Sequence, residues 1–197
     1  KTLSAQLPGR TTVEASGFLA GGLTPAFSGD LLLAVAQPSG FAAWLGQEAD
    51  EAIRRLPGAG LQGHANLTRE RQSLSELEIR LGEAAFHGHF DRVTAADGSP
   101  SIDLDLDGGA LDLAAVEALA SLFGGAGVVD GLSGQAARMA LRAGPVDFGG
   151  LVAERVDTAL RLTDGRLEID RLLVDGLAGA HVSATATITG LGGAASG

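Results

Sequence analysis

Hydrophobic and polar residues alternate along most of the chain, and this alternation predicts β-strands with one apolar and one polar face. The clearest example is PSIDLDLDGG, where Ile102, Leu104 and Leu106 alternate with three aspartates before two glycines. Asp112 then precedes LAAVEALASLF, whose apolar residues recur at helical spacing. Because an aspartate can accept hydrogen bonds from the first N–H groups of a helix, we predict a strand followed by a short, Asp112-capped helix.

The same pattern along the rest of the chain predicts further strands with short helices between them. The predicted strands cover residues 2–7, 11–20, 27–37, 60–67, 77–81, 86–90, 102–107, 136–143, 156–163, 166–175 and 180–190, and the predicted helical segments cover 41–46, 49–56 and 113–123. The consecutive Leu31, Leu32 and Leu33 indicate a strand buried on both faces. Trp44 is predicted to pin the first helix onto the sheet, with a position at the rim of a groove as the alternative.

Two internal repeats indicate that similar units are stacked along the chain. A shift of 35 residues aligns Leu104 with Met139, Leu106 with Leu141, Leu111 with Val146, Asp112 with Asp147 and Leu113 with Phe148. A shift of 95 residues aligns Leu67 with Leu162, Thr68 with Thr163, Arg71 with Arg166, Leu74 with Ile169, Leu77 with Leu172 and Ile79 with Val174. The segment LLLAVAQPSGFAAWLG, residues 31–46, follows the same order of strand, break and helical turn.

These units define the predicted organisation of the chain. Residues 1–58 form a first β-repeat with a short helix, and 59–123 form a β-meander plus helix. Residues 124–135, GGAGVVDGLSGQ, form a Gly-rich linker, and 136–197 form a third meander with a frayed C-terminal tail. The predicted fold is mainly β with a few short helices (α+β): repeated antiparallel β-meander modules that form a curved, open, groove-like sheet.

Composition and charge restrict the partners. The formal net charge of −10, with 14 basic residues dispersed along the sequence, disfavours nucleic acid. The chain has no cysteine, which excludes disulfides and thiolate metal sites. No run of 18 apolar residues occurs, and the chain starts with neither Met nor a signal peptide, so we expect a segment of a longer protein. With seven Phe, one Trp and no Tyr, the composition suits an aliphatic surface for acyl chains.

Candidate chemistry is sparse, and we predict no catalytic residue, no metal site and no cofactor. Asp103, Asp105 and Asp107 resemble the start of a calcium loop, but the twelfth position is Ala114, so a solvated strand face is the favoured interpretation. His87 and His89 share one strand face without a visible third ligand. Neither a nucleophile elbow nor a dinucleotide-binding glycine motif is present. The sequence therefore predicts a protein that is not an enzyme.

Within the repeats, residues 140–188, ALRAGPVDFGGLVAERVDTALRLTDGRLEIDRLLVDGLAGAHVSATATI, resemble the recurring module of the AsmA family, which includes TamB-like relatives. Residues 7–46, LPGRTTVEASGFLAGGLTPAFSGDLLLAVAQPSGFAAWLG, are similar to the middle repeats of that family. The two segments cover about half of the chain. The resemblance implies a curved sheet with an apolar concave face and open edges, in a periplasmic protein anchored to the inner membrane by a helix outside this segment.

The resemblance also implies a function. Such a groove would carry phospholipid acyl chains between the inner and outer membranes or otherwise support outer-membrane biogenesis. The alternative is a structural spacer or docking module for outer-membrane assembly proteins that binds no lipid. The residues expected to face lipid are Leu77, Ile79, Leu104, Leu106, Leu160, Leu162, Ile169, Val182 and Ala184.

Overall fold

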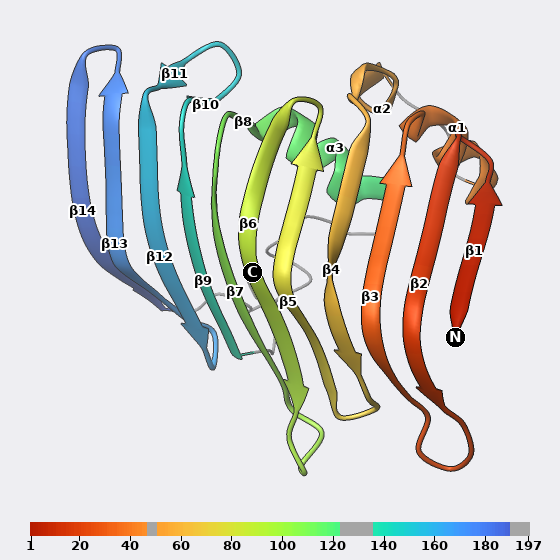
Figure 1. The fold of residues 1–197 in the computed structure, drawn as a ribbon. Helices are drawn as coiled ribbons and strands as arrows, with labels where there is room; N and C mark the ends of the chain where they lie inside the picture. Colours follow the sequence, from red (N-terminus) through yellow and green to blue (C-terminus); the bar gives the residue numbers. More distant parts are fainter. Residues whose placement is uncertain (47–50, 123–135, 190–197) are drawn as a thin grey trace, which may run out of the picture.

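The computed structural model describes residues 1–46, 51–122 and 136–189, and within them it is mainly β (Figure 1). Eleven strands form one open sheet in the order β1-β2-β3-β4-β5-β6-β7-β9-β12-β13-β14. All neighbouring pairs are antiparallel except β7 and β9. A second, three-stranded sheet has the order β11-β10-β8. The predicted mainly β, open-sheet fold is thus confirmed.

The strands of the large sheet are β1 Thr2–Leu7, β2 Thr11–Ala20, β3 Ala26–Val35, β4 Ala59–Leu67, β5 Arg71–Leu81, β6 Ala84–Thr94, β7 Pro100–Gly108, β9 Ala136–Ala143, β12 Arg155–Thr163, β13 Arg166–Leu177 and β14 Ala180–Thr189. The small sheet contains β8 Leu111–Asp112, β10 Val146–Asp147 and β11 Val152–Ala153. The helices are α1 Pro38–Trp44, α2 Glu51–Arg55 and α3 Leu113–Leu122. The predicted boundary at 58/59 falls between α2 and β4, and the large sheet continues across it; the boundary at 123/124 lies outside the described residues, and β7 and β9 on either side of it pair in the same sheet. The predicted linker lies outside the described residues.

The 35-residue repeat corresponds to the parallel pairing in both sheets. Leu104 pairs with Met139 and Leu106 with Leu141 between β7 and β9, and Leu111 pairs with Val146 between β8 and β10. Asp112 caps α3 as predicted, because its Oδ1 accepts the backbone N–H of Ala114 at 2.9 Å. The second copy forms no helix at this point, since Gly149 and Gly150 follow Phe148 with φ of 81° and 103°.

The 95-residue repeat preserves a β-bulge. In β5, Leu74 and Leu77 are three residues apart, and in β13 Ile169 and Leu172 have the same spacing. A bulge inserts one extra residue, so side chains on both sides of it stay on one face of the sheet despite the odd spacing. The sequence predicted only residues 77–81 of β5 because the bulge interrupts its alternation.

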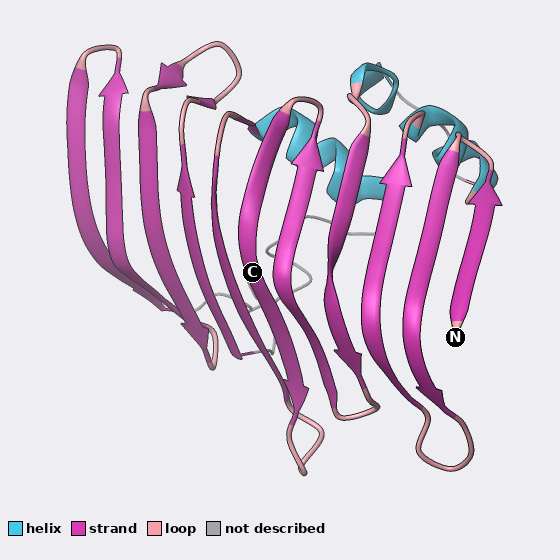
Figure 2. Ribbon diagram, viewed as in Figure 1, coloured by secondary structure: helices cyan, strands magenta, loops and turns pink. Residues whose placement is uncertain are grey.

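Helices and the small sheet cover only one end of the large sheet, the upper end in Figures 1 and 2. One cluster packs α1, α2 and α3 against β5 through Ala42, Ile53, Leu56, Leu81 and Ala115. A second cluster packs the small sheet against β6, β9, β12 and β13 through Phe86, Leu111, Ala143, Val146, Ala153, Val156 and Val174. The rest of the apolar face has no second layer among the described residues.

Two predictions about burial are wrong. Leu31, Leu32 and Leu33 are each only half-buried. Leu32 points to the face opposite the helices, and no described element covers it there. Trp44 is not a core residue: it is 49% exposed, although its ring lies 5.7 Å from that of the buried Phe41. Trp44 is the last residue of α1, and the buried residues of this helix are Pro38, Phe41 and Ala42.

Candidate functional site: an apolar cleft on one face of the sheet

One face of the large sheet is apolar across all eleven strands, and we call it the apolar face. Directly paired residues lie on the same face, and pairing across the sheet joins Leu77, Gly88, Leu106, Leu141, Thr158, Leu172 and Ala184 into one row. A second row joins Leu74, Phe90, Leu104, Met139, Leu160, Ile169 and Ala186. The face is continuous because side chains alternate along each strand and because the bulges in β5 and β13 lie at equivalent positions, between the two rows.

A cleft of about 380 Å³ lies on this face, and we call it the apolar cleft. It is lined by Ile79, Leu81, Phe86, Leu104, Leu106, Leu111, Leu113, Val116, Met139, Ala140, Leu141, Thr158 and Leu160. Strands β5, β6, β7, β9 and β12 supply its floor, while β8 and α3 contribute Leu111, Leu113 and Val116 from the second layer. Thr158 is the one residue with a polar side chain in this lining. The chemistry of the cleft therefore suits an aliphatic ligand.

All nine residues predicted to face lipid lie on the apolar face. Ile79, Leu104, Leu106 and Leu160 also line the cleft. The other five, Leu77, Leu162, Ile169, Val182 and Ala184, lie on the same face outside the lining. Leu77 is buried at 2% exposure, whereas Val182 on the edge strand is 40% exposed. The sequence did not predict Leu111, Leu113 and Val116 as cleft residues. Alternation along a strand shows which face of the sheet is apolar, but not which helix or short strand packs on that face.

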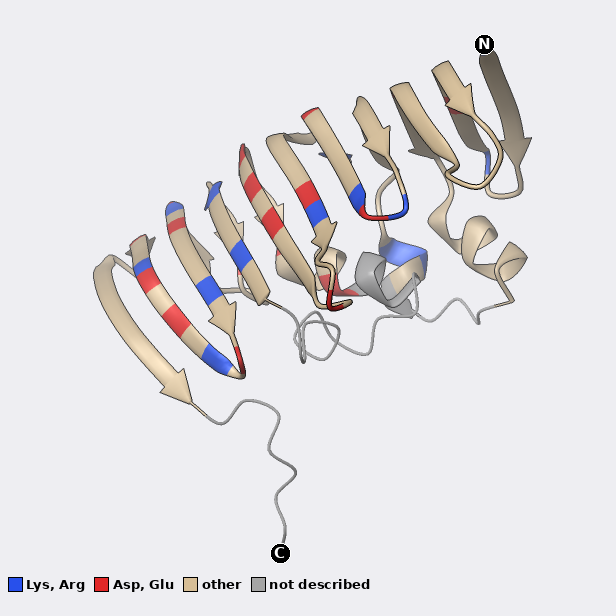
Figure 3. Ribbon diagram, turned by 90° about the horizontal axis from the view of Figure 1, so that it is seen from below, with Lys and Arg blue, Asp and Glu red and all other residues tan. Residues whose placement is uncertain are grey.

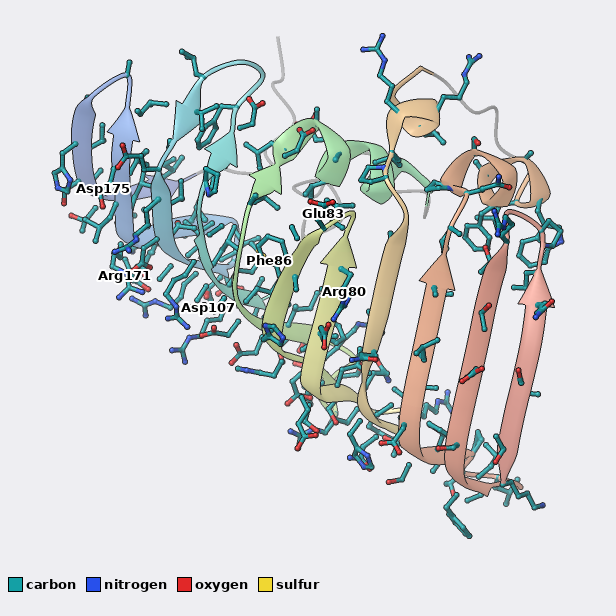
Figure 4. All side chains as sticks on the ribbon, turned by 45° about the horizontal axis from the view of Figure 1, so that its top comes forward. Arg80, Glu83, Phe86, Asp107, Arg171 and Asp175 are labelled. Atoms are coloured by element: carbon teal, nitrogen blue, oxygen red, sulfur yellow. The ribbon has the colours of Figure 1, made fainter. Side chains whose placement is uncertain are left out.

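The opposite face is polar and carries cross-strand ion pairs. Figure 3 shows that charged residues are frequent from β5 to β13 and sparse on β1, β2, β3 and β14. Arg142 Nε donates to Asp107 at 2.6 Å, and Arg161 binds Asp170 through two hydrogen bonds of 2.6 Å. The hydrogen bond from Arg161 lowers the pKa of Asp170, and the one to Asp107 raises the pKa of Arg142. Figure 4 labels Asp107, Arg80 and Arg171 of this face. These ion pairs keep the polar face hydrated and leave the apolar face as the surface available to a nonpolar ligand.

The acidic strand β7 places its aspartates on the polar face, beside basic side chains. Asp105 and Asp107 lie on an extended strand and bind Arg142, so their carboxylates are neutralised by a cation of the protein. His87 and His89 lie on the same polar face, 3.9 Å from Glu78 and 3.8 Å from Asp103. Within residues 1–46, 51–122 and 136–189, no three His, Asp or Glu side chains are grouped to hold a metal ion.

Gly88 lies in the row of Leu77 and Leu106, where two strands approach closely. A Cβ at this position would lie 1.8 Å from the backbone O of Asp105, so an added methyl group must separate β6 from β7. We expect Gly88→Ala to lower the free energy of unfolding by about 1–3 kcal/mol, the usual cost of overpacking. Urea unfolding followed by circular dichroism measures this change.

Gly21→Ala is the matched control for Gly88→Ala. A Cβ at Gly21 would meet nothing within 4 Å, and the residue lies in the loop between β2 and β3. Its substitution is expected to change the free energy of unfolding by less than about 0.5 kcal/mol. Equal effects of the two substitutions would contradict the close strand approach at Gly88.

No protein-family model matches this chain, and searches of curated proteins and of solved structures likewise give no match. None of the helices in the described part of the chain is long and apolar enough to cross a bilayer. The open antiparallel sheet and its apolar cleft are therefore the features that bear on function.

Proposed function

We propose that this chain is a non-enzymatic segment of an AsmA-like protein whose apolar face accepts phospholipid acyl chains during transport between the inner and outer membranes. The observation that carries the proposal is the apolar cleft, whose lining is almost wholly hydrocarbon and which opens onto a part of the apolar face that no described element covers. Contiguous exposed apolar surface on a protein is typical of a binding site. Each methylene group buried there contributes about 0.8 kcal/mol, which suits a long aliphatic chain.

The location in the cell belongs to the same proposal. The resemblance of residues 140–188 and 7–46 to the AsmA family supports a periplasmic protein, held at the inner membrane by a helix outside this segment. The phospholipid is then the partner at the apolar face, and outer-membrane assembly proteins are the candidate protein partners. The net charge of −10 is unfavourable for nucleic acid.

A structural spacer or docking module is the second candidate function. The observation that favours it is the packing of α1, α2, α3 and the small sheet over one end of the apolar face, which buries Leu81, Phe86 and Val174. If an unidentified protein covered the remaining apolar face, the sheet would act as a scaffold without lipid. The two candidates differ in whether hydrocarbon enters the apolar cleft.

Native mass spectrometry of the purified chain distinguishes these functions. Expressed in a bacterium with export to the periplasm and released gently from detergent, the chain is expected to retain phospholipid, seen as adducts of 600–800 Da or so. Extraction with organic solvent and lipid analysis identifies the adducts. A chain that stays free of lipid, even after incubation with excess phospholipid, would exclude the transport proposal and favour the spacer.

A further inference from the structure

A single charged side chain lies on the otherwise apolar face among the strand residues that the structure describes. It belongs to Arg92 on β6, which pairs with Gln72 on β5 and with Ile102 on β7. The alternation that puts Phe86, Gly88 and Phe90 on the apolar face continues to Arg92. A cation on a hydrocarbon surface requires a partner that satisfies its charge.

Gln72 holds the Arg92 guanidinium in place. The Arg92 Nη1 donates to Gln72 Oε1 at 3.0 Å in a partly buried contact. The Gln72 amide nitrogen donates to the backbone O of Thr68 at 2.8 Å and of Arg69 at 3.2 Å. These contacts orient the amide so that its oxygen faces Arg92, which fixes one edge of the guanidinium.

The charge of Arg92 has no acidic partner among the described residues. Nearby arginines on the polar face do have one: Arg71, on the strand next to Arg92, binds Asp91 with two hydrogen bonds of 2.9 and 2.6 Å. A guanidinium has five N–H donors, so Arg92 retains donors after it binds the neutral Gln72. An anion with several acceptor oxygens, such as a phosphate group, complements both the charge and these donors.

The position of Arg92 suits the headgroup of a ligand whose chain occupies the apolar cleft. Phe86 lines the cleft and lies on the same strand, six residues from Arg92. At the rise of a β-strand this separation is about 20 Å, whereas Gly88, which pairs with the cleft residue Leu106, is about 13 Å from Arg92. One acyl chain, half of the ~30 Å hydrocarbon thickness of a bilayer, is about 15 Å deep and therefore reaches from Arg92 into the cleft. Leu104 and Met139 also line the cleft and lie in one row with Phe90, which is two residues from Arg92 on β6.

We propose that Arg92, positioned by Gln72, binds the phosphate of a phospholipid whose acyl chain lies along β6 toward the apolar cleft. This inference rests on the proposed acyl-chain function and adds the orientation and headgroup preference of the ligand. The phosphate lies at the end of the apolar face farthest from the helices. A neutral lipid with the same chains lacks the group that Arg92 recognises and therefore binds more weakly.

The test compares dioleoyl phosphatidylglycerol with dioleoylglycerol, each titrated into the full chain in the same nonionic detergent and measured by native mass spectrometry. We expect wild-type protein to prefer the phospholipid at least tenfold, and Arg92→Gln to lose that preference while its binding of dioleoylglycerol is unchanged. Arg92→Lys retains part of the preference because the charge remains. Arg138→Gln is the matched control, since Arg138 lies on the polar face opposite Asp103 and retains the full preference.

The outcomes separate this inference from the proposed function. If wild-type protein binds both lipids equally, or if Arg92→Gln keeps the phospholipid preference, the headgroup role of Arg92 is wrong and acyl-chain binding stands. If wild-type protein binds neither lipid, the acyl-chain function fails and the role of Arg92 fails with it. Circular dichroism of each variant confirms that a loss of preference does not come from unfolding.

Discussion

Replacement of Phe86 by alanine is expected to lower the free energy of unfolding by about 3–5 kcal/mol. Phe86 is 4% exposed and packs between the large sheet and the small sheet, in one cluster with Leu111, Val146 and Val156. The substitution removes a ring from a site that α3 and the small sheet cannot collapse to fill. Because small domains are typically stable by only 5–15 kcal/mol, the loss is large. Urea unfolding followed by circular dichroism measures it.

Phe18→Ala provides the control with identical chemistry. Phe18 lies on β2 and is 71% exposed, so its ring contributes little buried area. We expect a change of less than about 0.5 kcal/mol in the free energy of unfolding. A comparable loss for Phe18→Ala, or a negligible one for Phe86→Ala, would mean that the second layer does not cover the sheet at Phe86.

Leu160→Asp is expected to reduce bound phospholipid more than tenfold. Leu160 lines the apolar cleft and pairs with Met139 and Ile169 on the apolar face. A carboxylate in contact with hydrocarbon costs about 2.5–3.5 kcal/mol by membrane-insertion measurements, and 1.4 kcal/mol corresponds to a tenfold change in affinity. The measurement is lipid retained per protein after purification, with circular dichroism to establish that the sheet remains folded.

Ala159→Asp places the same charge one residue away on the polar face. Ala159 pairs with Arg171, so the new carboxylate has a basic neighbour and contacts water. Lipid retention is expected to equal that of the wild type. If Leu160→Asp folds and keeps its lipid, or if both variants lose lipid equally, the apolar face is not the binding surface.

The strands could be predicted from the sequence because one face of the sheet is solvated. β1, β2 and β9 begin and end where the alternation indicates, and Asp112 caps the predicted helix. The 35-residue repeat also predicts the register of β7 against β9, because residues that align in the repeat are paired in the sheet. When repeated units stack in parallel, equivalent positions lie side by side, so similarity in sequence becomes adjacency in space.

The second layer could not be predicted in the same way. The two-residue strands β8, β10 and β11 are too short to show alternation, yet they cover Phe86 and Val156. Large aromatic residues are usually buried, which favours a core position for Trp44, but Trp44 is the last residue of α1 and is 49% exposed. Which part of an apolar face is covered depends on tertiary packing and is not encoded in the period of a strand.

The candidate site was predicted in part. Alternation placed Leu104, Leu106 and Leu160 on one face, but the cleft itself requires α3 and β8. The alternation from Phe86 to Phe90 extends to Arg92, but a lone arginine in a strand has no motif that marks it as a binding residue. The bulge between Leu74 and Leu77 shifts the alternation by one residue, so a strict period of two counted back from Leu77 assigns Gln72 to the wrong face of the sheet.

Quenching of tryptophan fluorescence by phospholipids with brominated acyl chains tests the central claim most directly. The chain has one tryptophan, so Trp44→Phe provides a background in which a new tryptophan reports one position. Leu104 lines the apolar cleft, and Asp103, its neighbour on β7, lies on the polar face. Acyl-chain binding at the cleft predicts strong quenching for Leu104→Trp and little for Asp103→Trp. Equal quenching at both positions, or none at Leu104→Trp, would contradict the account.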